Sequence, residues 1–170
     1  VTQEGLAIIG RETDRLIILV NDLLDFSKLQ AHRIELKKTE FSIKQLLTDV
    51  HNQFVIRCHQ EKIKMTLLTD NRESWVFADY NRLKQVFINI VDNAIKFTAG
   101  RPKAEIKISS QVLDDQIVMI IEDNGSGIST EDLKRVKEKF YKGSSNKSGT
   151  GLGLSIVKEV LEKHGFEYGV

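Results

Sequence analysis

The sequence predicts an α+β domain preceded by one long helix, and three observations carry this prediction. Residues 4–29 repeat large apolar side chains every seven positions, as the helices of a bundle do. Later stretches show apolar residues at helical spacing, and between them lie short runs that alternate or are continuously apolar, as strands are. A chain of 170 residues is long enough to hold one well-buried domain and an appendage.

The first predicted element is the helix over residues 4–29. Its apolar stripe repeats at Ile9, Leu16 and Leu23, and neighbouring leucines widen the stripe beyond a simple coiled-coil seam. One helix cannot bury such a stripe alone, so we expect a partner helix or a second chain. The pattern changes near residues 30–38, where we place the boundary with the next domain.

The second part of the chain predicts interleaved strands and helices. Strands are predicted at residues 33–37, 64–69, 75–78, 105–109 and 116–122, with a hairpin through Asp114 and Asp115 joining the last two. Helices with one apolar face are predicted at residues 43–60, 80–97 and 152–163, with a short helix after Ser129. Their start signals are an N-cap at Asp79 and capping boxes at Ser42 with Gln45 and at Ser129 with Asp132.

Composition excludes several classes of protein. Hydrophobic residues at 41% and charged residues at 29% are typical of a soluble globular protein. The formal charge of +1 and the lack of a dense basic run argue against a nucleic-acid partner. The single cysteine, Cys58, rules out an intrachain disulfide and argues against a zinc site. No apolar run reaches membrane-spanning length, so we expect these residues on the cytoplasmic side, with any membrane anchor elsewhere in a longer protein.

The helix predicted at residues 80–97 has an unusual polar face. Asn89, Asn93 and Lys96 follow one another at i, i+4 and i+7 and therefore lie on one stripe. An amide oxygen is a suitable ligand for Mg²⁺, and a lysine one turn away suits a phosphate group. An ordinary amphipathic helix would also leave a polar face in water, so this helix alone does not decide between the two.

A second motif, Asp123-Asn-Gly-Ser-Gly-Ile, follows directly after a buried strand. A carboxylate at the end of a strand can accept a hydrogen bond from an exocyclic amino group, such as that of adenine. Gly125 and Gly127 would let the backbone approach a base or turn sharply. A plain Asn-Gly hairpin turn is the alternative for this stretch taken by itself.

A third motif, Gly149-Thr-Gly-Leu-Gly-Leu, opens the last predicted helix. Glycine backbone N–H groups at a helix N-terminus favour a polyphosphate, although a flexible connector would look similar. The motif lacks the glycine spacing of a P-loop, and no strand directly precedes it as in a Rossmann fingerprint. It ends a long connection from residue 123, the kind of segment that often carries function.

In this order, the three motifs resemble the N, G1 and G2 boxes of the catalytic and ATP-binding region of sensor histidine kinases, in the GHKL ATPase superfamily. Phe140-Tyr-Lys142 resembles the F box of that family, and residues 12–27 resemble the second helix of its dimerisation and phosphoacceptor domain. The resemblance thus divides the chain into residues 1–32, that second helix, and residues 33–170, the catalytic ATP-binding domain.

The resemblance implies a two-layer α/β sandwich, a mixed sheet covered by three helices, that binds ATP and Mg²⁺ beneath a flexible lid. Asn93 would ligate Mg²⁺, Lys96 would contact phosphate, and Asp123 would read the amino group of adenine. Asn89, Asn93 and Lys96 would serve catalysis. The residues expected around the nucleotide are Asn89, Asn93, Lys96, Phe97, Asp123, Gly125, Gly127, Ile128, Phe140, Lys142, Gly149, Thr150, Gly151, Leu152, Gly153 and Leu154.

Two positions bear on the reaction that the resemblance implies. Relatives that hydrolyse ATP, such as gyrase, carry a glutamate at the position of Asn89 to activate water, and an amide cannot accept that proton. Asn89 therefore favours transfer of the phosphoryl group to a protein histidine over hydrolysis. Lys142 stands where the family often has arginine, which replaces a bidentate phosphate contact by a point charge.

The phosphoacceptor histidine of the family, in its acidic and Thr-Pro-Leu context, has no counterpart among His32, His51, His59 and His164. We therefore expect a part of a longer protein, without the acceptor helix and truncated near the end of the catalytic domain. The implied activity is a histidine kinase that phosphorylates a histidine outside this sequence and then a response regulator, as a homodimer. A nucleotide-sensing or dimerisation module without transfer, or a GHKL ATPase, is the alternative.

Overall fold

The computed structural model describes residues 5, 10, 13, 16, 20, 35–70, 72–136, 138, 141 and 151–170. Within the predicted helix over residues 4–29, the described positions all have helical backbone. Four of these five are exposed, among them the large apolar side chains of Leu16 and Val20. The rest of that helix lies outside the described residues, so the bundle helix, its partner and the boundary near residues 30–38 stay predictions.

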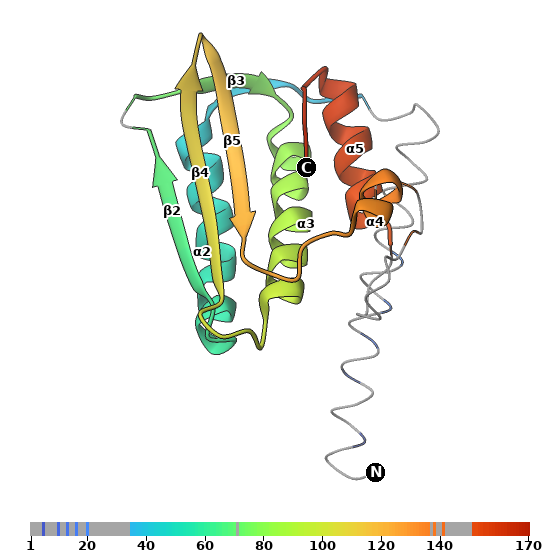
Figure 1. Cartoon of the computed structure of the whole chain (residues 1–170). Coiled ribbons are helices and arrows are strands. Elements are labelled where there is room, and N and C mark those ends of the chain that lie inside the picture. Colours follow the sequence, from blue (N-terminus) through green and yellow to red (C-terminus); the bar gives the residue numbers. More distant parts are fainter. Residues whose placement is uncertain are drawn as a thin grey trace.

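The remaining elements follow the order that the sequence predicts, and the α+β fold class is confirmed (Figure 1). They are β1 (Thr39–Ser42), α2 (Ile43–Gln60), β2 (Lys64–Thr69), β3 (Trp75–Ala78), α3 (Tyr80–Thr98), β4 (Glu105–Leu113), β5 (Gln116–Asp123), α4 (Thr130–Arg135) and α5 (Gly153–His164). Within the described part of the chain, no helix combines the length and the apolar content needed to cross a bilayer.

The helix starts obey the local signals in the sequence. The Ser42 hydroxyl accepts the N–H of Gln45, and the Ser129 hydroxyl accepts the N–H of Asp132 at 3.1 Å. Asp79 caps α3 by accepting the N–H of Arg82 at 3.1 Å. Each cap satisfies a backbone donor that the first helical turn leaves without a partner.

One strand prediction was wrong. The described residues 35–38 are not in a strand, and β1 starts at Thr39 instead. The reason is the pairing partner: β1 runs antiparallel to β3, with Phe41 opposite Val76. That register packs the Phe41 ring edge-on against Tyr80, with ring centroids 5.0 Å apart, whereas the N–H of Lys37 bonds to a side chain. Alternation in the sequence cannot show which stretch will find a neighbouring strand.

The mixed sheet that the sequence predicts is formed by β2, β4 and β5. β2 is parallel to β4, and β4 is antiparallel to β5. β1 and β3 pair separately as a two-stranded sheet. Asp114 and Asp115 form the two-residue turn between β4 and β5, and both have positive φ angles, 46° and 63°, as the tight hairpin turn that matches strand twist requires.

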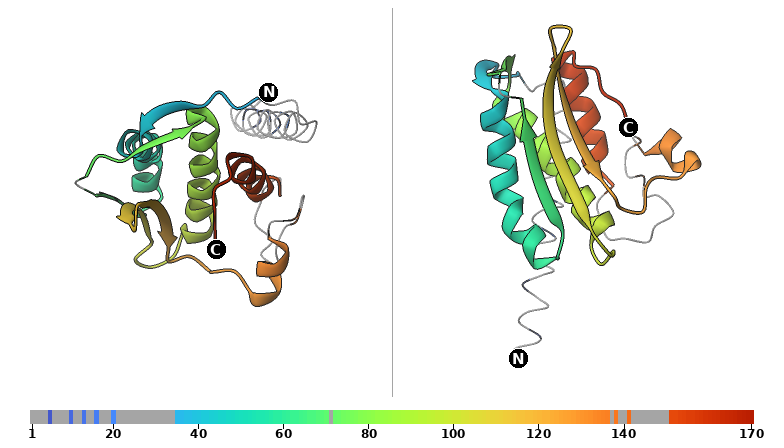
Figure 2. Two further views of the ribbon diagram at one scale, coloured as in Figure 1. Left: turned by 90° about the horizontal axis from the view of Figure 1, so that it is seen from above. Right: turned by 60° about the vertical axis from the view of Figure 1, so that its left-hand side comes forward.

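Two buried clusters of side chains hold the helices in place. The larger one joins α2, α3 and the mixed sheet, with Leu47, Leu83 and Ile106 fully buried. The smaller one joins α3 to α5 through Val86, Leu152, Ile156, Val157 and Val160. Figure 2 shows α5 lying beside α3, away from α2. This second cluster sets the start of α5 against the middle of α3.

Candidate functional site

The first part of the site forms where the middle of α3 meets the first turn of α5. Asn89 and Asn93, here called the amide pair, lie on the α3 face that turns toward α5. The Asn89 Nδ2 group donates to the Gly153 carbonyl at 3.4 Å. A Cβ atom placed on Gly153 would lie 3.9 Å from Asn89 Cβ and 3.9 Å from Asn93 Nδ2. Two segments that are 64 residues apart in sequence therefore meet at one place.

The second part of the site forms where β5 ends beside the C-terminal end of α3. The Asp123 Oδ1 atom accepts the N–H of Gly125 at 2.8 Å and lies 3.5 Å from the Thr98 hydroxyl. Its other oxygen has no hydrogen bond within the described residues, and the side chain is exposed. The carboxylate is thus fixed through one oxygen, while the other can accept a further donor.

Gly125 brings the loop after β5 into close contact with α3. A Cβ atom at Gly125 would lie 2.5 Å from Asp123 Oδ1 and 3.0 Å from the Phe97 carbonyl oxygen. Real Cβ atoms essentially never come within 3.0 Å of another heavy atom, and the Phe97 carbonyl belongs to a helix that cannot easily move. Glycine at this position therefore follows from close approach to α3, while the approach to a base that is expected from the sequence stays a prediction.

The remaining residues of the predicted site have varied surroundings. The Lys96 ammonium group lies 5.3 Å from the Phe97 ring centroid, a cation–π distance. Gly127 has a φ of 69° and Ile128 is exposed, both in the loop after β5. Gly151 has a φ of 75° just before α5.

The G2-like motif is described only in part. The Leu152 side chain is buried in the α3–α5 cluster, so this residue can present only its backbone to a ligand, whereas Leu154 is half-buried. The predicted site residues that lie outside the described part are Phe140, Lys142, Gly149 and Thr150.

Tyr141, which precedes this motif in the chain, makes two side-chain contacts with α4. The Tyr141 hydroxyl donates to Asp132 at 2.5 Å, and Arg135 lies 4.4 Å from the Tyr141 ring centroid. The hydrogen bond to Asp132 raises the pKa of the Tyr141 phenol, so the hydroxyl keeps its proton and can donate it. Tyr141 is therefore anchored to α4.

Sequence reasoning missed two residues that the structure places beside Asp123. Thr98 is fully buried, and its hydroxyl lies within hydrogen-bond reach of the Asp123 carboxylate. The only sign of this in the sequence is a polar residue on the buried face of the helix, which is a weak signal for a binding residue. Asn124 binds the turn that precedes β4 through its side chain. The Asn-Gly hairpin turn that was the alternative for this stretch is not formed, because Asn124 follows a strand whose hairpin lies at the other end.

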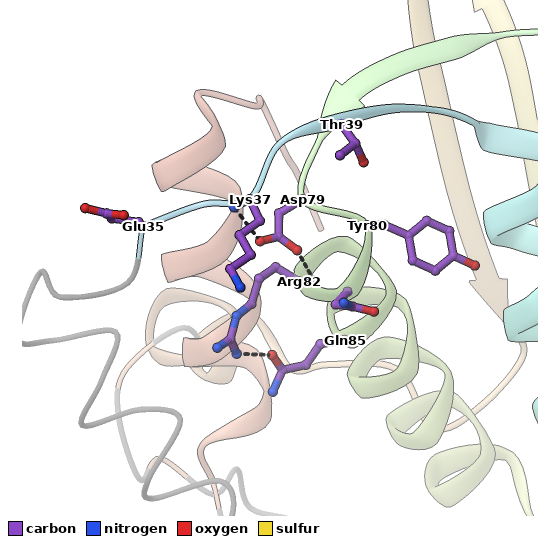
Figure 3. Close-up of a pocket in the computed structure, with 8 residues that line it drawn as sticks. Glu35, Lys37, Thr39, Asp79, Tyr80, Arg82 and Gln85 are labelled. Carbon is purple, nitrogen blue, oxygen red and sulfur yellow. Dashed lines mark hydrogen bonds between the residues drawn. The ribbon is translucent and has the colours of Figure 1, made fainter.

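A hollow of about 590 Å³ lies elsewhere, at the N-terminal end of α3 (Figure 3). It is lined by Glu35, Lys37, Thr39, Asp79, Tyr80, Asn81, Arg82 and Gln85. Its side chains bond to protein groups: Asp79 accepts from Lys37 and Arg82, and Arg82 donates to Gln85 at 2.9 Å. None of the residues of the predicted motifs lines it, so the concave surface and the candidate site are different places.

The comparison with protein families matches residues 78–170 to the model described as histidine kinase-, DNA gyrase B-, and HSP90-like ATPase. Among curated proteins, the sensor protein SrrB of Staphylococcus aureus strain MRSA252 is 34% identical over 167 residues. That alignment covers 96% of this chain but 28% of SrrB, so the chain spans less than a third of the length of this relative.

Solved structures of histidine kinases are also similar to this chain. Full-length ShkA in complex with AMPPNP gives a TM-score of 0.82 at 30% identity, covering 96% of this chain and 34% of that one. The Acinetobacter baumannii histidine kinase AdeS gives 0.75 at 28% identity, covering 95% and 74%. The histidine kinase ThkA in complex with the response regulator TrrA gives 0.74 at 28% identity, covering 96% and 45%.

Proposed function

Since the chain belongs to the family of histidine kinase-, DNA gyrase B-, and HSP90-like ATPases, we propose that it is the ATP-binding part of a protein histidine kinase. The observation that carries this proposal is the meeting of the amide pair with Gly153, on the same helix whose C-terminal end adjoins Asp123. Segments of the three separate motifs thus meet at α3, the start of α5 at the middle of the helix and the loop after β5 at its C-terminal end, which supports one site that they share.

The groups present fit an adenine nucleotide with Mg²⁺. The unbonded oxygen of Asp123 can accept the amino group of adenine, and guanine would present an oxygen to it instead. The amide oxygen of Asn93 is a hard ligand of the type that Mg²⁺ takes, and this side chain has no hydrogen bond within the described residues. α5 begins without a side-chain cap, unlike α2, α3 and α4, as expected where a helix N-terminus faces a phosphate.

The proposed reaction is transfer of the γ-phosphoryl group to a histidine outside this sequence. When bound, Mg²⁺ would supply neutralisation of charge on the phosphates. Asn89 is the residue that separates transfer from hydrolysis, because its amide donates to Gly153 and cannot accept a proton from water. Lys96, on the same side of α3, would hold the phosphates by its positive charge.

The described histidines do not resemble acceptors. Both ring nitrogens of His164 are engaged, Nε2 by the Asp79 N–H at 3.0 Å and Nδ1 by the Val160 carbonyl at 2.8 Å. His51 and His59 lie on α2 without the expected acidic and Thr-Pro context. The acceptor is therefore proposed to be a bundle helix of the same full-length homodimer, with a response regulator aspartate as the next acceptor, as the ThkA–TrrA complex suggests.

The alternative function is a nucleotide-sensing module without transfer. The absence of an acceptor-type histidine and the lysine at position 142 favour it. It shares the nucleotide site with the kinase and differs only in the transfer step. Binding and transfer must therefore be tested separately.

The binding test is calorimetric titration with Mg·ATP. We expect binding by the wild type and a loss of affinity of at least about tenfold for Asn93→Ala, since a metal ligand is removed. The matched control is Asn52→Ala, because Asn52 is an exposed asparagine on α2. A wild type that does not bind, or equal affinities of wild type and Asn93→Ala, would contradict the nucleotide site.

The transfer test uses γ-labelled ATP and a separate acceptor-domain protein of this family. Stable label on histidine, lost in Asn93→Ala, supports the kinase. Nucleotide binding without label supports the sensing module. Release of labelled phosphate without label on protein would instead support an ATPase and would contradict the role given to Asn89.

A further inference from the structure

The residue after the proposed adenine-reading carboxylate, Asn124, joins the β5 end to the turn before β4. Its backbone N–H donates to the Glu105 carbonyl at 3.2 Å. Its side-chain oxygen accepts the Glu105 N–H at 2.8 Å, and its side-chain nitrogen donates to the Lys103 carbonyl at 2.7 Å. The side-chain amide thus acts like an extra peptide group. It continues the pairing of β4 with β5 beyond their last regular pair, Ile106 with Asp123.

This arrangement limits the motion of Asp123. Asp123 itself pairs with Ile106 in the β4–β5 ladder, and the three hydrogen bonds of Asn124 hold the chain at the next residue. The N–H of Gly125, the next residue, is the 2.8 Å donor to Asp123 Oδ1. With Asn124 fixed, that donor is fixed, and the carboxylate can rotate little about its side-chain bonds.

Without Asn124, the loop would have few restraints. Gly125 and Gly127 follow within three residues, and glycine permits a wide range of backbone conformations. Asn124 is exposed, and so are its neighbours Ser126 and Gly127, so a hydrophobic core does not hold this stretch. Three hydrogen bonds at one exposed residue, two of them shorter than 2.9 Å, are therefore the main restraint on the loop.

We propose that Asn124 is a positioning residue that sets base selectivity, by holding the Asp123 carboxylate where it accepts the 6-amino group of a purine. The proposal rests on the proposed nucleotide site. It differs from a purely structural role because a fixed acceptor favours one base over another. General weakening of the fold would reduce the affinity for all nucleotides alike.

The test compares Mg·ATP with Mg·ITP, which has an oxygen in place of the 6-amino group, by calorimetry. We expect the wild type to prefer ATP by roughly 10- to 100-fold, the range for one hydrogen bond to a charged group. In Asn124→Ala, ATP affinity should fall toward that of ITP while ITP affinity stays the same. Asn52→Ala, on α2, should keep the wild-type ratio.

Each outcome has a distinct meaning. A wild type that binds neither nucleotide overturns the proposed function. A wild type that prefers ATP, together with an Asn124→Ala variant that keeps the ratio or loses both affinities equally, overturns the role of Asn124 alone. If Asn124→Ala does not fold, Asn124→Asp decides, because it keeps the acceptor for Glu105 and lacks the donor to Lys103. For Asn124→Asp we expect a ratio of ATP to ITP affinity between that of the wild type and that of Asp123→Asn. A ratio equal to that of the wild type overturns the proposal.

Discussion

Two aspartates, Asp79 before α3 and Asp123 at the end of β5, lie beside the two ends of α3 in opposite surroundings. At the start, Asp79 is almost buried, its two carboxylate oxygens accept the N–H groups of Lys37 and Arg82, and its own N–H donates to His164. At the other end, Asp123 is exposed and one of its oxygens has no hydrogen bond within the described residues. The same functional group is saturated at one end and available at the other.

This difference separates a structural carboxylate from one that could accept a ligand group. Burying a carboxylate is unfavourable unless hydrogen bonds from the protein replace those from water. The hydrogen bonds that Asp79 accepts therefore offset the cost of its burial. The hollow at this end is therefore bordered by groups that already bond one another (Figure 3). Fewer hydrogen bonds join the side chains of the candidate nucleotide site to one another. The contacts between its sequence motifs point to this site, whereas the hollow lies elsewhere.

The largest effect expected from this comparison is on folding stability. Asp79→Ala removes the α3 cap and leaves the part-buried N–H groups of Lys37 and Arg82 without this acceptor, so the free energy of unfolding should fall by about 2 kcal/mol. Asp123→Ala, an exposed aspartate, should lower it by less than about 1 kcal/mol and abolish nucleotide binding. Urea unfolding and Mg·ATP titration of both variants check this. Equal losses of stability would show that the two ends do not differ as described.

A second substitution tests the close approach at the Asp123 end of α3. Gly125→Ala would place a Cβ atom 3.0 Å from the Phe97 carbonyl oxygen and 2.5 Å from Asp123 Oδ1, which forces the loop and the carboxylate to move. Affinity for Mg·ATP should fall by about 100-fold, equivalent to about 2.7 kcal/mol. Gly169→Ala is the matched control, since no atom lies within 4 Å of its Cβ position. Unchanged affinity in Gly125→Ala would place the nucleotide elsewhere.

The smallest expected effect concerns the pH dependence of the structural end. Burial, together with the hydrogen bond from its hydroxyl to Asp49, raises the pKa of Tyr80 to about 12. An unfolded tyrosine ionises near pH 10, so the stability that Tyr80 contributes is complete below about pH 10 and is lost as pH rises from about 10 to 12. Tyr80→Phe should lower the free energy of unfolding by about 1 kcal/mol at pH 8.

Urea unfolding at pH 8 and at pH 11 checks the effect of Tyr80. The difference between wild type and Tyr80→Phe should be smaller at pH 11, and Mg·ATP affinity at pH 8 should be the same in both. A difference that does not change with pH would contradict the link to ionisation. A change in Mg·ATP affinity would contradict the separation of the two ends of α3.

Much of the fold could be predicted because its signals are local. The caps at Ser42 and Asp79 set the starts of α2 and α3, and alternating residues set β4 with its two-residue turn into β5. The position of β1 could not be predicted, because it depends on β3 as a partner across more than thirty residues of chain. Thr98 and Asn124 were missed for the same reason, since their roles come from atoms of distant segments.

The sequence by itself determined the chemistry of the candidate site: two amides and a lysine at helical spacing, a carboxylate at a strand end, and glycines before a helix. These depend only on neighbours in the chain, so composition and spacing reveal them. Only the tertiary structure decided that Gly153 meets Asn89 and that the Asp123 loop meets the end of α3. The reason is that these contacts follow from the packing of α5 on α3 and of β5 beside it, and packing depends on the shapes of side chains far apart in the sequence.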